Sequence, residues 1–361
     1  MGKVYSMVIK YLDSKRLEGV AGDLTATPVI GVGGWKEVGR TTLGSTTKPI
    51  TVSSIANKRY YMFLIDMNKS GNATSNLRVG NGTIDGGNNY ARRQSYNGAS
   101  DGTAINVSTL EMATANAGVG DFIVGYITNL SNKEKLFQMH WMYNSATGAG
   151  TAPTRGEHVG KWANTSNVID IIQLYNSQSG NYLSGSEVVV LGWDPADTHT
   201  DNFWEPLGST TLATAGDNIE VTFTAKKYLM VKLYRKPTGS ADARWTFNND
   251  GGANYAKRKS SDGSTDSTSE GLNQNYFTQY TYDNNEPSYS STIIVNTAGA
   301  EKLGTQHEMT PSSAGASAQV HRSESVFKWA NTSDQITTID ITNSKSGSYD
   351  VGSIIEVWGH D

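Results

Sequence analysis

The chain has 361 residues, of which 37% are hydrophobic, and a formal net charge of −4. A slightly acidic chain without a clustered basic face does not fit nucleic-acid binding, and 8 Trp, 18 Tyr and 8 Phe are too many aromatic residues for a disordered protein. The absence of cysteine excludes disulfide bonds and thiolate metal sites, and it fits folding in a reducing cytoplasm.

Residues 1–34 have no counterpart elsewhere in the chain, and we expect them to form a short N-terminal arm. Apolar residues recur there at the spacing of an amphipathic helix: Val4, Met7, Val8, Tyr11 and Leu12. Such an arm either packs on the first domain or docks the protein to a larger assembly. The start of the chain has no signal-peptide pattern, and no window holds 18 apolar residues, so we expect neither secretion nor a membrane partner.

One hexapeptide, Lys-Trp-Ala-Asn-Thr-Ser, occurs twice, at Lys161–Ser166 and Lys328–Ser333. The offset of 167 residues (328 − 161) is kept by the glycines near the end of each copy, Gly192 and Gly359. Aromatic residues repeat at nearly the same spacing: Trp35 with Trp204, Trp162 with Trp329, and Tyr90 with Tyr255. A repeat of this length predicts two tandem copies of one fold, which we place at residues 35–196 and 197–361.

Both copies read as short strands separated by turns. The alternation in Ile339-Asp340-Ile341 is typical of a half-exposed strand. The Asp-Gly-Gly sequences at Asp85 and Asp250 supply the backbone freedom that a tight turn needs. We therefore predict an all-β protein with two antiparallel β-sandwich domains of the jelly-roll type. The polar stretches Ser95–Thr109 and Ser260–Gln274 are predicted to be long recognition loops.

Residues able to support catalysis are sparse. Among six histidines only His140 and His307 correspond between the copies, and no metal-ligand spacing occurs, so we expect a packing role for this pair. Two short-spaced charged pairs also repeat, and each is either a structural ion pair or an acid/base pair: Arg155 with Glu157, and Arg322 with Glu324. Phosphate-binding loops and nucleophile elbows are missing, so the sequence predicts no catalytic residue, no metal, no cofactor and no enzyme.

The repeated tryptophans and tyrosines lie beside apolar strands and are interpreted as scaffold. Four other tryptophans have no tryptophan at the matched position, and they are the candidates for surface binding, as sugar-stacking platforms or as interface anchors: Trp141, Trp193, Trp245 and Trp358.

The shared pattern resembles a family of small β-sandwich proteins encoded among the virion genes of tailed bacteriophages. The resemblance rests on the turns at Asp85–Tyr90 and Asp250–Tyr255, on Trp162–Ser166 and Trp329–Ser333, and on the Ser-Gly turns and closing strands that follow. It covers most of residues 35–361 and implies a virion component such as a capsid decoration protein, head fibre or tail appendage. The tandem duplication and the arm are departures from the family pattern.

The leading hypothesis is thus a non-enzymatic virion structural protein that decorates the capsid, made in the host cytoplasm. Its expected partners are the major capsid protein or other virion proteins and further copies of itself. The alternative is a tail or fibre module that binds a host surface glycan. A glycan-cleaving enzyme is a remote third hypothesis, since a β-sandwich can hold paired carboxylates.

Overall fold

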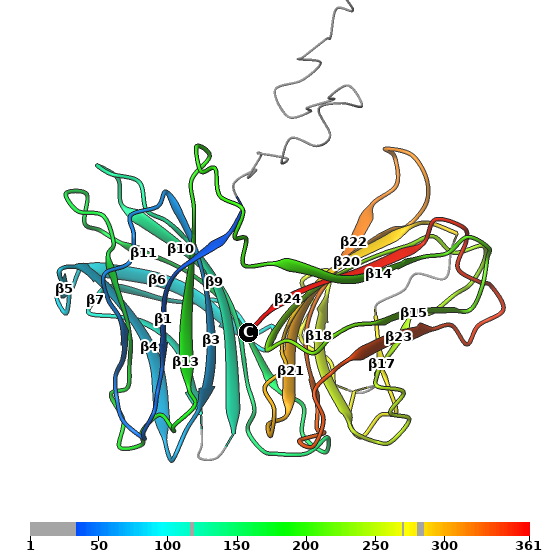
Figure 1. Ribbon diagram of the computed structural model, residues 1–361, viewed down its shortest axis with the longest axis horizontal. Helices are drawn as coiled ribbons and strands as arrows, with labels where there is room; N and C mark the ends of the chain where they lie inside the picture. Colours follow the sequence, from blue (N-terminus) through cyan, green and yellow to red (C-terminus); the bar gives the residue numbers. More distant parts are fainter. Residues whose placement is uncertain (1–33, 116–118, 269–270, 280–284) are drawn as a thin grey trace, which may run out of the picture.

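The computed structural model describes residues 34–115, 119–268, 271–279 and 285–361, which fold into strands, turns and loops (Figure 1). Every strand of residues 36–193 lies in one pair of sheets, and every strand of residues 205–360 lies in a second pair. The predicted boundary after residue 196 falls between these two sets of strands. The helix expected within residues 1–34 lies outside the described residues, and only Gly34 of the arm belongs to them.

The first sandwich has one wide and one narrow sheet. The wide sheet has the order β1 (Lys36–Thr42), β13 (Glu187–Trp193), β3 (Tyr60–Asn68), β9 (Gly120–Thr128), β10 (Lys135–Tyr143), β11 (Thr154–Trp162), β6 (Tyr90–Tyr96) and β7 (Gly102–Val107). The narrow sheet has the order β2 (Ile50–Val52), β12 (Ile171–Tyr175), β4 (Ala73–Asn81) and β5 (Thr83–Ile84), and β8 (Leu110–Ala115) also pairs with β4.

The second sandwich repeats this plan with fewer strands. Its wide sheet has the order β14 (Glu205–Thr211), β24 (Ile354–His360), β16 (Tyr228–Arg235), β20 (Ser288–Val295), β21 (Lys302–Pro311), β22 (Val320–Trp329) and β18 (Tyr255–Ser261). Its narrow sheet has the order β15 (Asn218–Thr222), β23 (Thr338–Thr342), β17 (Arg244–Phe247) and β19 (Phe277–Thr278).

The strand order is that of a jelly roll in both copies. In the first, β1-β13-β3-β9 faces β2-β12-β4-β8, and in the second, β14-β24-β16-β20 faces β15-β23-β17-β19. Each wide sheet is then extended by a hairpin and a third strand, β10-β11-β6 and β21-β22-β18, and the first sheet also by β7. All pairings between named strands are antiparallel. The predicted all-β fold with two tandem jelly-roll sandwiches is therefore confirmed.

Strand β3 is buried along nearly its whole length because both of its faces are covered. Tyr61 and Phe63 point into the core of the first sandwich, where they contact the narrow sheet's side chains. Met62 and Leu64, which alternate with them, belong to a separate apolar cluster shared with the second sandwich. A strand covered on both sides reads as a continuous apolar run rather than an alternating one, as the sequence Tyr60–Ile65 does.

The repeated sequence motifs meet in space and hold each sandwich together. Asp85 accepts hydrogen bonds from the indole Nε1 of Trp162 at 2.7 Å, from the amide of Gly87 and from Asn89. The Tyr90 hydroxyl, in turn, donates to the carbonyl of Asp85 at 2.9 Å. Burial acts to raise the pKa of Asp85, but the hydrogen bonds from Trp162, Asn89 and Gly87 to its carboxylate outweigh it and lower the pKa.

The second copy builds the same unit. Trp329 donates to Asp250 at 2.7 Å, Gly252 and Asn254 donate to the same carboxylate, and Tyr255 contacts the Asp250 carbonyl at 3.1 Å. Trp162, Trp329, Tyr90 and Tyr255 are all almost fully buried. The residues that the two motifs share thus form one hydrogen-bonded corner in each sandwich.

Two of the four candidate surface tryptophans are in the core, which corrects the sequence-based prediction. Trp141 and Trp245 have 0% of their surface exposed. Trp141 is on the inward-facing side of β10, where it stacks on Tyr143 and meets the edge of Tyr96. Trp245 is on β17 and stacks on Phe277. The lack of a matching tryptophan in the other copy reflects different core packing and not a role at the surface.

The two predicted recognition loops also differ from expectation. Ser95–Thr109 contains β7, which forms a hairpin with β6, so much of this stretch is regular sheet. The other stretch contacts the first sandwich: Asp266 binds Arg155, and the amide of Asn273 donates to the carbonyl of Ala149 at 3.0 Å. Part of Ser260–Gln274 is therefore occupied by an intramolecular contact.

Candidate functional site

The two sandwiches pack together through the outer faces of their wide sheets. Thirteen buried residues from both sandwiches and from the connecting segment form one apolar cluster: Met62, Leu64, Phe122, Val124, Met142, Val189, Leu191, Phe203, Tyr228, Ile293, Val295, Leu303 and Val326. Each face contributes alternate residues of its strands, as the period of a strand requires. The cluster makes this junction an extension of the protein interior.

Buried charges accompany the apolar contact. Glu187 accepts hydrogen bonds from the hydroxyl of Tyr228 at 2.8 Å and from Lys227 at 3.1 Å, and it also pairs with Arg40 at 3.1 Å. Asp66 accepts from Thr297 at 2.7 Å. Hydrogen bonds from Thr42 and Tyr228, together with Lys227 and Arg40, hold the pKa of Glu187 low against the effect of its burial. These groups fix the second sandwich to the first.

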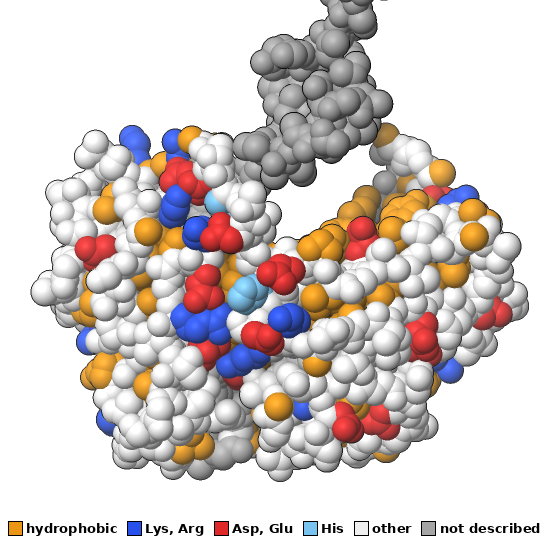
Figure 2. Space-filling view, viewed as in Figure 1, with side chains coloured by type: hydrophobic (Ala, Val, Ile, Leu, Met, Phe, Trp, Pro, Cys, Tyr) orange, Lys and Arg blue, Asp and Glu red, His pale blue; other side chains and the backbone are white. Residues whose placement is uncertain are grey.

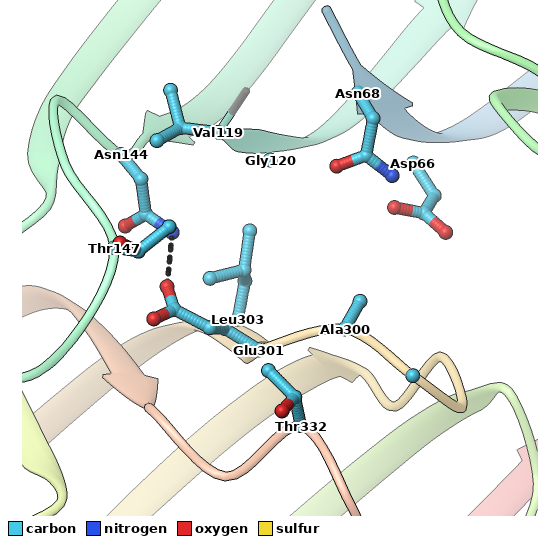
Figure 3. A pocket seen from close by; sticks show the side chains of 11 residues that line it. Asp66, Asn68, Val119, Gly120, Asn144, Thr147, Ala300, Glu301, Leu303 and Thr332 are labelled. Carbon is cyan, nitrogen blue, oxygen red and sulfur yellow. Dashed lines mark hydrogen bonds between the residues drawn. The ribbon is translucent and has the colours of Figure 1, made fainter. Parts of the chain in front are cut away.

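A polar cavity of about 290 Å³ lies at this junction (Figure 3). The two carboxylates in its lining, Asp66 and Glu301, come from opposite sandwiches. Glu301 accepts a hydrogen bond from Asn144 at 3.0 Å, so this carboxylate is already bound by the facing sandwich. Burial raises the pKa of Asp66, against the opposing influence of Lys227 and Thr297. Both acids thus serve the contact between the sandwiches.

The repeated histidines meet at the same junction. The ring centroids of His140 and His307 are 4.4 Å apart, with the rings nearly perpendicular. Glu157 lies opposite His140 across β10 and β11, and Glu324 lies opposite His307 across β21 and β22. Two histidines and two acids therefore gather between the sandwiches.

Arginines neutralise these acids. Arg155 pairs with Glu157 and also binds both oxygens of Asp266, at 2.7 and 3.0 Å. Arg322 pairs with Glu324. The two repeated pairs are thus ion pairs within their own hairpins, as one of the two interpretations of the sequence had it. Within the described residues no group of three or more His, Cys, Asp or Glu side chains could hold a metal ion.

We predict that the free energy of unfolding falls as the pH is lowered, because His140 and His158 are buried as neutral side chains. Burial lowers the pKa of His140 to about 3, with help from His307 and Arg155, and burial and Arg92 lower the pKa of His158 to about 3. An unfolded histidine binds a proton near pH 6.5. Between about pH 6.5 and 3 the unfolded chain thus binds more protons, so the free energy of unfolding decreases as the pH falls.

The second copy suggests the variant that tests this. His158 aligns with Ser325 at the offset of 167, and we expect His158→Ser to reduce the stability lost between pH 7 and 5 by about 1–2 kcal/mol. Urea unfolding at several pH values measures the change. An unchanged pH slope would show that His158 binds its proton at the same pH in the folded and the unfolded chain, which would contradict the prediction.

An aromatic pocket of about 370 Å³ opens on the outer face of the first sandwich. The rings on this outer face are Trp35, Tyr60, Tyr126 and Trp193, and they come from the residue before β1 and from β3, β9 and β13. Tyr60 stacks on Trp193 with centroids 5.6 Å apart, and Trp35 lies 6.2 Å from Trp193 and 6.2 Å from Tyr126. Tyr126 is 38% exposed at the edge of the pocket.

The second sandwich has an exposed apolar row on its own outer face. Tyr234, Tyr289 and Met309 lie side by side on β16, β20 and β21 and are each about 40% exposed. Trp358 is half-buried on the same face, opposite Met230. Figure 2 shows hydrophobic side chains gathered on the second sandwich along the hollow between the two halves. We call the outer surface around the aromatic pocket and the outer surface around the row Tyr234, Tyr289 and Met309 the two open faces.

The structure places two of the four predicted surface tryptophans on the open faces and two in the core. Trp193 lines the aromatic pocket and Trp358 lies on the second open face, whereas Trp141 and Trp245 are core residues. Sequence reasoning missed Tyr60 and Tyr126, which are as important to the pocket as Trp193. The only signal was their place in strands with apolar residues on both faces.

Comparisons with known proteins do not identify the chain. No protein-family model and no curated protein matches it. Among solved structures, domains LG4-5 of the mouse laminin α1 chain are 8% identical, with 90% of each chain covered and a TM-score of 0.15. OpdQ of Pseudomonas aeruginosa is 10% identical over 87% of this chain and 70% of that chain, with a TM-score of 0.16. Similarities this low carry no argument about function.

The described part of the chain offers no helix of the length and apolar character needed to cross a membrane.

Proposed function

We propose that this chain is a non-enzymatic structural protein of a tailed-bacteriophage virion, bound to the outer surface of the head. The observation that carries the proposal is the pair of open faces on an otherwise rigidly joined double jelly roll. Exposed aromatic and apolar groups of this kind serve binding, and patches of this kind mark interaction sites. Arg155 and Glu187, at the junction between the sandwiches, are engaged in ion pairs with Asp266 and Lys227.

The sequence pattern supports the assignment to a virion. The turn motif and the Trp-Ala-Asn-Thr-Ser motif, on which the resemblance to phage β-sandwich proteins rests, form one hydrogen-bonded corner in each copy. Jelly rolls are also common among viral capsid proteins, although the fold alone does not fix a function. A protein that binds the assembled shell, and not the free shell subunits, stabilises the assembled shell.

Locating the chain in purified virions tests the proposal. We expect mass spectrometry to find it in many copies per particle and labelled antibody to mark the head. The expected partners are the major capsid protein, other virion proteins and further copies of this chain. Absence from purified particles would refute the virion assignment, and labelling confined to the tail would refute the head location.

The aromatic pocket favours a second candidate function, a tail or fibre module that binds a host surface glycan. Aromatic rings present flat apolar surfaces on which sugar rings stack, and the Tyr60–Trp193 pair offers such a surface. Adsorption to host cells of virions that carry the Trp193→Ala variant in place of the natural protein distinguishes the candidates. Loss of adsorption with intact particle assembly would favour glycan binding, whereas normal adsorption would contradict it.

A further inference from the structure

The two copies differ by one aromatic ring next to the residue that opens each sandwich. Trp35 and Trp204 occupy matching places. The residue after each, Lys36 or Glu205, pairs with one of the two equivalent glycines, Gly192 or Gly359. The residue before Trp204 is Phe203, and the residue before Trp35 is Gly34. The second sandwich therefore has a phenyl ring at a position where the first has a glycine, and the side chain of Asn202 lies beside that glycine.

Phe203 fills an aromatic slot in the second sandwich. It is 1% exposed, stacks on His360 with centroids 4.5 Å apart, meets the edge of Trp204 at 5.0 Å and lies 6.2 Å from Tyr228. The ring is thus held on several sides by groups of the wide sheet and its edge.

The matching positions of the first sandwich line the aromatic pocket. In the first sandwich Tyr60 lies between Trp193 and Thr128 on the neighbouring strands. In the second, Tyr228 lies in the same way between His360 and Val295. The register is therefore the same in both copies. The lining of the pocket of about 370 Å³ includes the counterparts of the three groups that surround Phe203: Trp35 for Trp204, Tyr60 for Tyr228 and Trp193 for His360.

The surrounding face is an interface in the second copy. Leu303 and Val295 there are 2% and 1% exposed because the first sandwich covers them. Leu136, the counterpart of Leu303, is 53% exposed. The same face of the fold is hence covered by protein in one copy and open in the other.

We propose that the aromatic pocket receives an aromatic side chain, presented by a loop or terminus of a partner polypeptide, in the way that the second sandwich receives Phe203. The partner's phenyl ring packs against Trp35, Tyr60 and Trp193 where they line the pocket, and its flanking backbone crosses the open face near Leu136. We favour a polypeptide over a sugar because, in the second sandwich, the groups equivalent to the pocket lining hold the phenyl ring of Phe203. Aromatic anchors in pockets of this kind dominate protein interfaces.

This inference rests on the proposed function for the identity of the partner as a virion protein. Its test uses the purified full chain, so it stands or falls independently of where the protein is in the particle. Loss of the virion assignment would leave the pocket's preference for a phenyl ring unchanged, and loss of that preference would leave the virion assignment untouched.

The experiment follows the indole Nε1–H resonances of Trp35 and Trp193 by NMR. The probes are the capped tripeptides acetyl-Gly-Phe-Gly-amide and acetyl-Gly-Leu-Gly-amide, and methyl β-D-glucopyranoside and N-acetylglucosamine, all at the same concentrations. We expect the phenylalanine peptide to shift both resonances and the leucine peptide and the sugars to shift them far less.

Two matched variants show where binding occurs. Tyr126→Ser removes an exposed ring at the pocket, and Tyr234→Ser removes a ring of similar exposure, 40%, from the other open face. We expect Tyr126→Ser to weaken binding of the phenylalanine peptide by about fivefold to tenfold and Tyr234→Ser to leave it unchanged. Equal shifts with both peptides, shifts with a sugar alone, no shift at all, or equal weakening by both variants would each overturn the proposal.

Discussion

Replacement of Asp121 by asparagine is expected to lower the free energy of unfolding by about 3–5 kcal/mol, since it leaves a buried charge without its partner. Asp121 forms a salt bridge with Lys69, and both side chains have 0% of their surface exposed. Burial raises the pKa of Asp121, while the ammonium group of Lys69 acts in the opposite direction. Urea unfolding at pH 7 measures the loss.

The second sandwich supplies the control. Asp121 aligns with Ser288 and Lys69 aligns with Pro237, so this pair is replaced there by uncharged residues. We expect the double variant Lys69→Met, Asp121→Ser to recover much of the stability lost in Asp121→Asn, because no unpaired charge remains. A double variant as unstable as the single one would indicate that shape, rather than charge, makes this site sensitive.

Replacement of Trp329 by alanine is expected to destabilise the protein by about 3–5 kcal/mol, the usual cost of removing a large buried aromatic side chain. Trp329 is 0% exposed and stacks on Tyr255 with centroids 6.4 Å apart. Its ring also lies 6.0 Å from the ammonium group of Lys302, which is buried and donates to the carbonyls of Ala300 and Asn331. Thermal and urea unfolding measure the effect.

Trp329→Phe separates packing from hydrogen bonding. It keeps an aromatic ring but removes the donor to Asp250, so we expect a smaller loss of about 1–3 kcal/mol. The same pair of substitutions at Trp162, which donates to Asp85 in the same way, serves as a replicate in the first sandwich. Equal losses for alanine and phenylalanine at either position would mean that the hydrogen bond, not the ring volume, holds the corner together.

The tryptophans show where prediction from sequence reaches its limit. Trp162 and Trp329 repeat with their neighbours, and their burial in equivalent corners is as predicted. Trp141 and Trp193 both lack a counterpart, yet one is in the core and the other lines a pocket. A one-residue step along a strand moves a side chain from one face to the other, and the sequence does not show which face of β10 or β13 meets the second sandwich.

His140 and His307 illustrate the same limit. Their equivalence predicted a shared structural role, but their contact with each other depends on how two separate sheets are placed. No local pattern encodes that placement, since it is set by the apolar cluster and by buried pairs such as Glu187 with Lys227, which join residues from different sandwiches.

The sequence by itself determined that the protein is a doubled all-β chain, because repeats, turn residues and strand periodicity are local and survive in the linear order. Only the tertiary structure decided which faces of the two sandwiches are buried against each other and which stay open. The physical reason is that the wide sheets are apolar on both sides, so burial of their outer faces depends on the partner sheet's position. The aromatic pocket beside Trp193 is likewise formed only in the tertiary structure, because its rings come from separate strands.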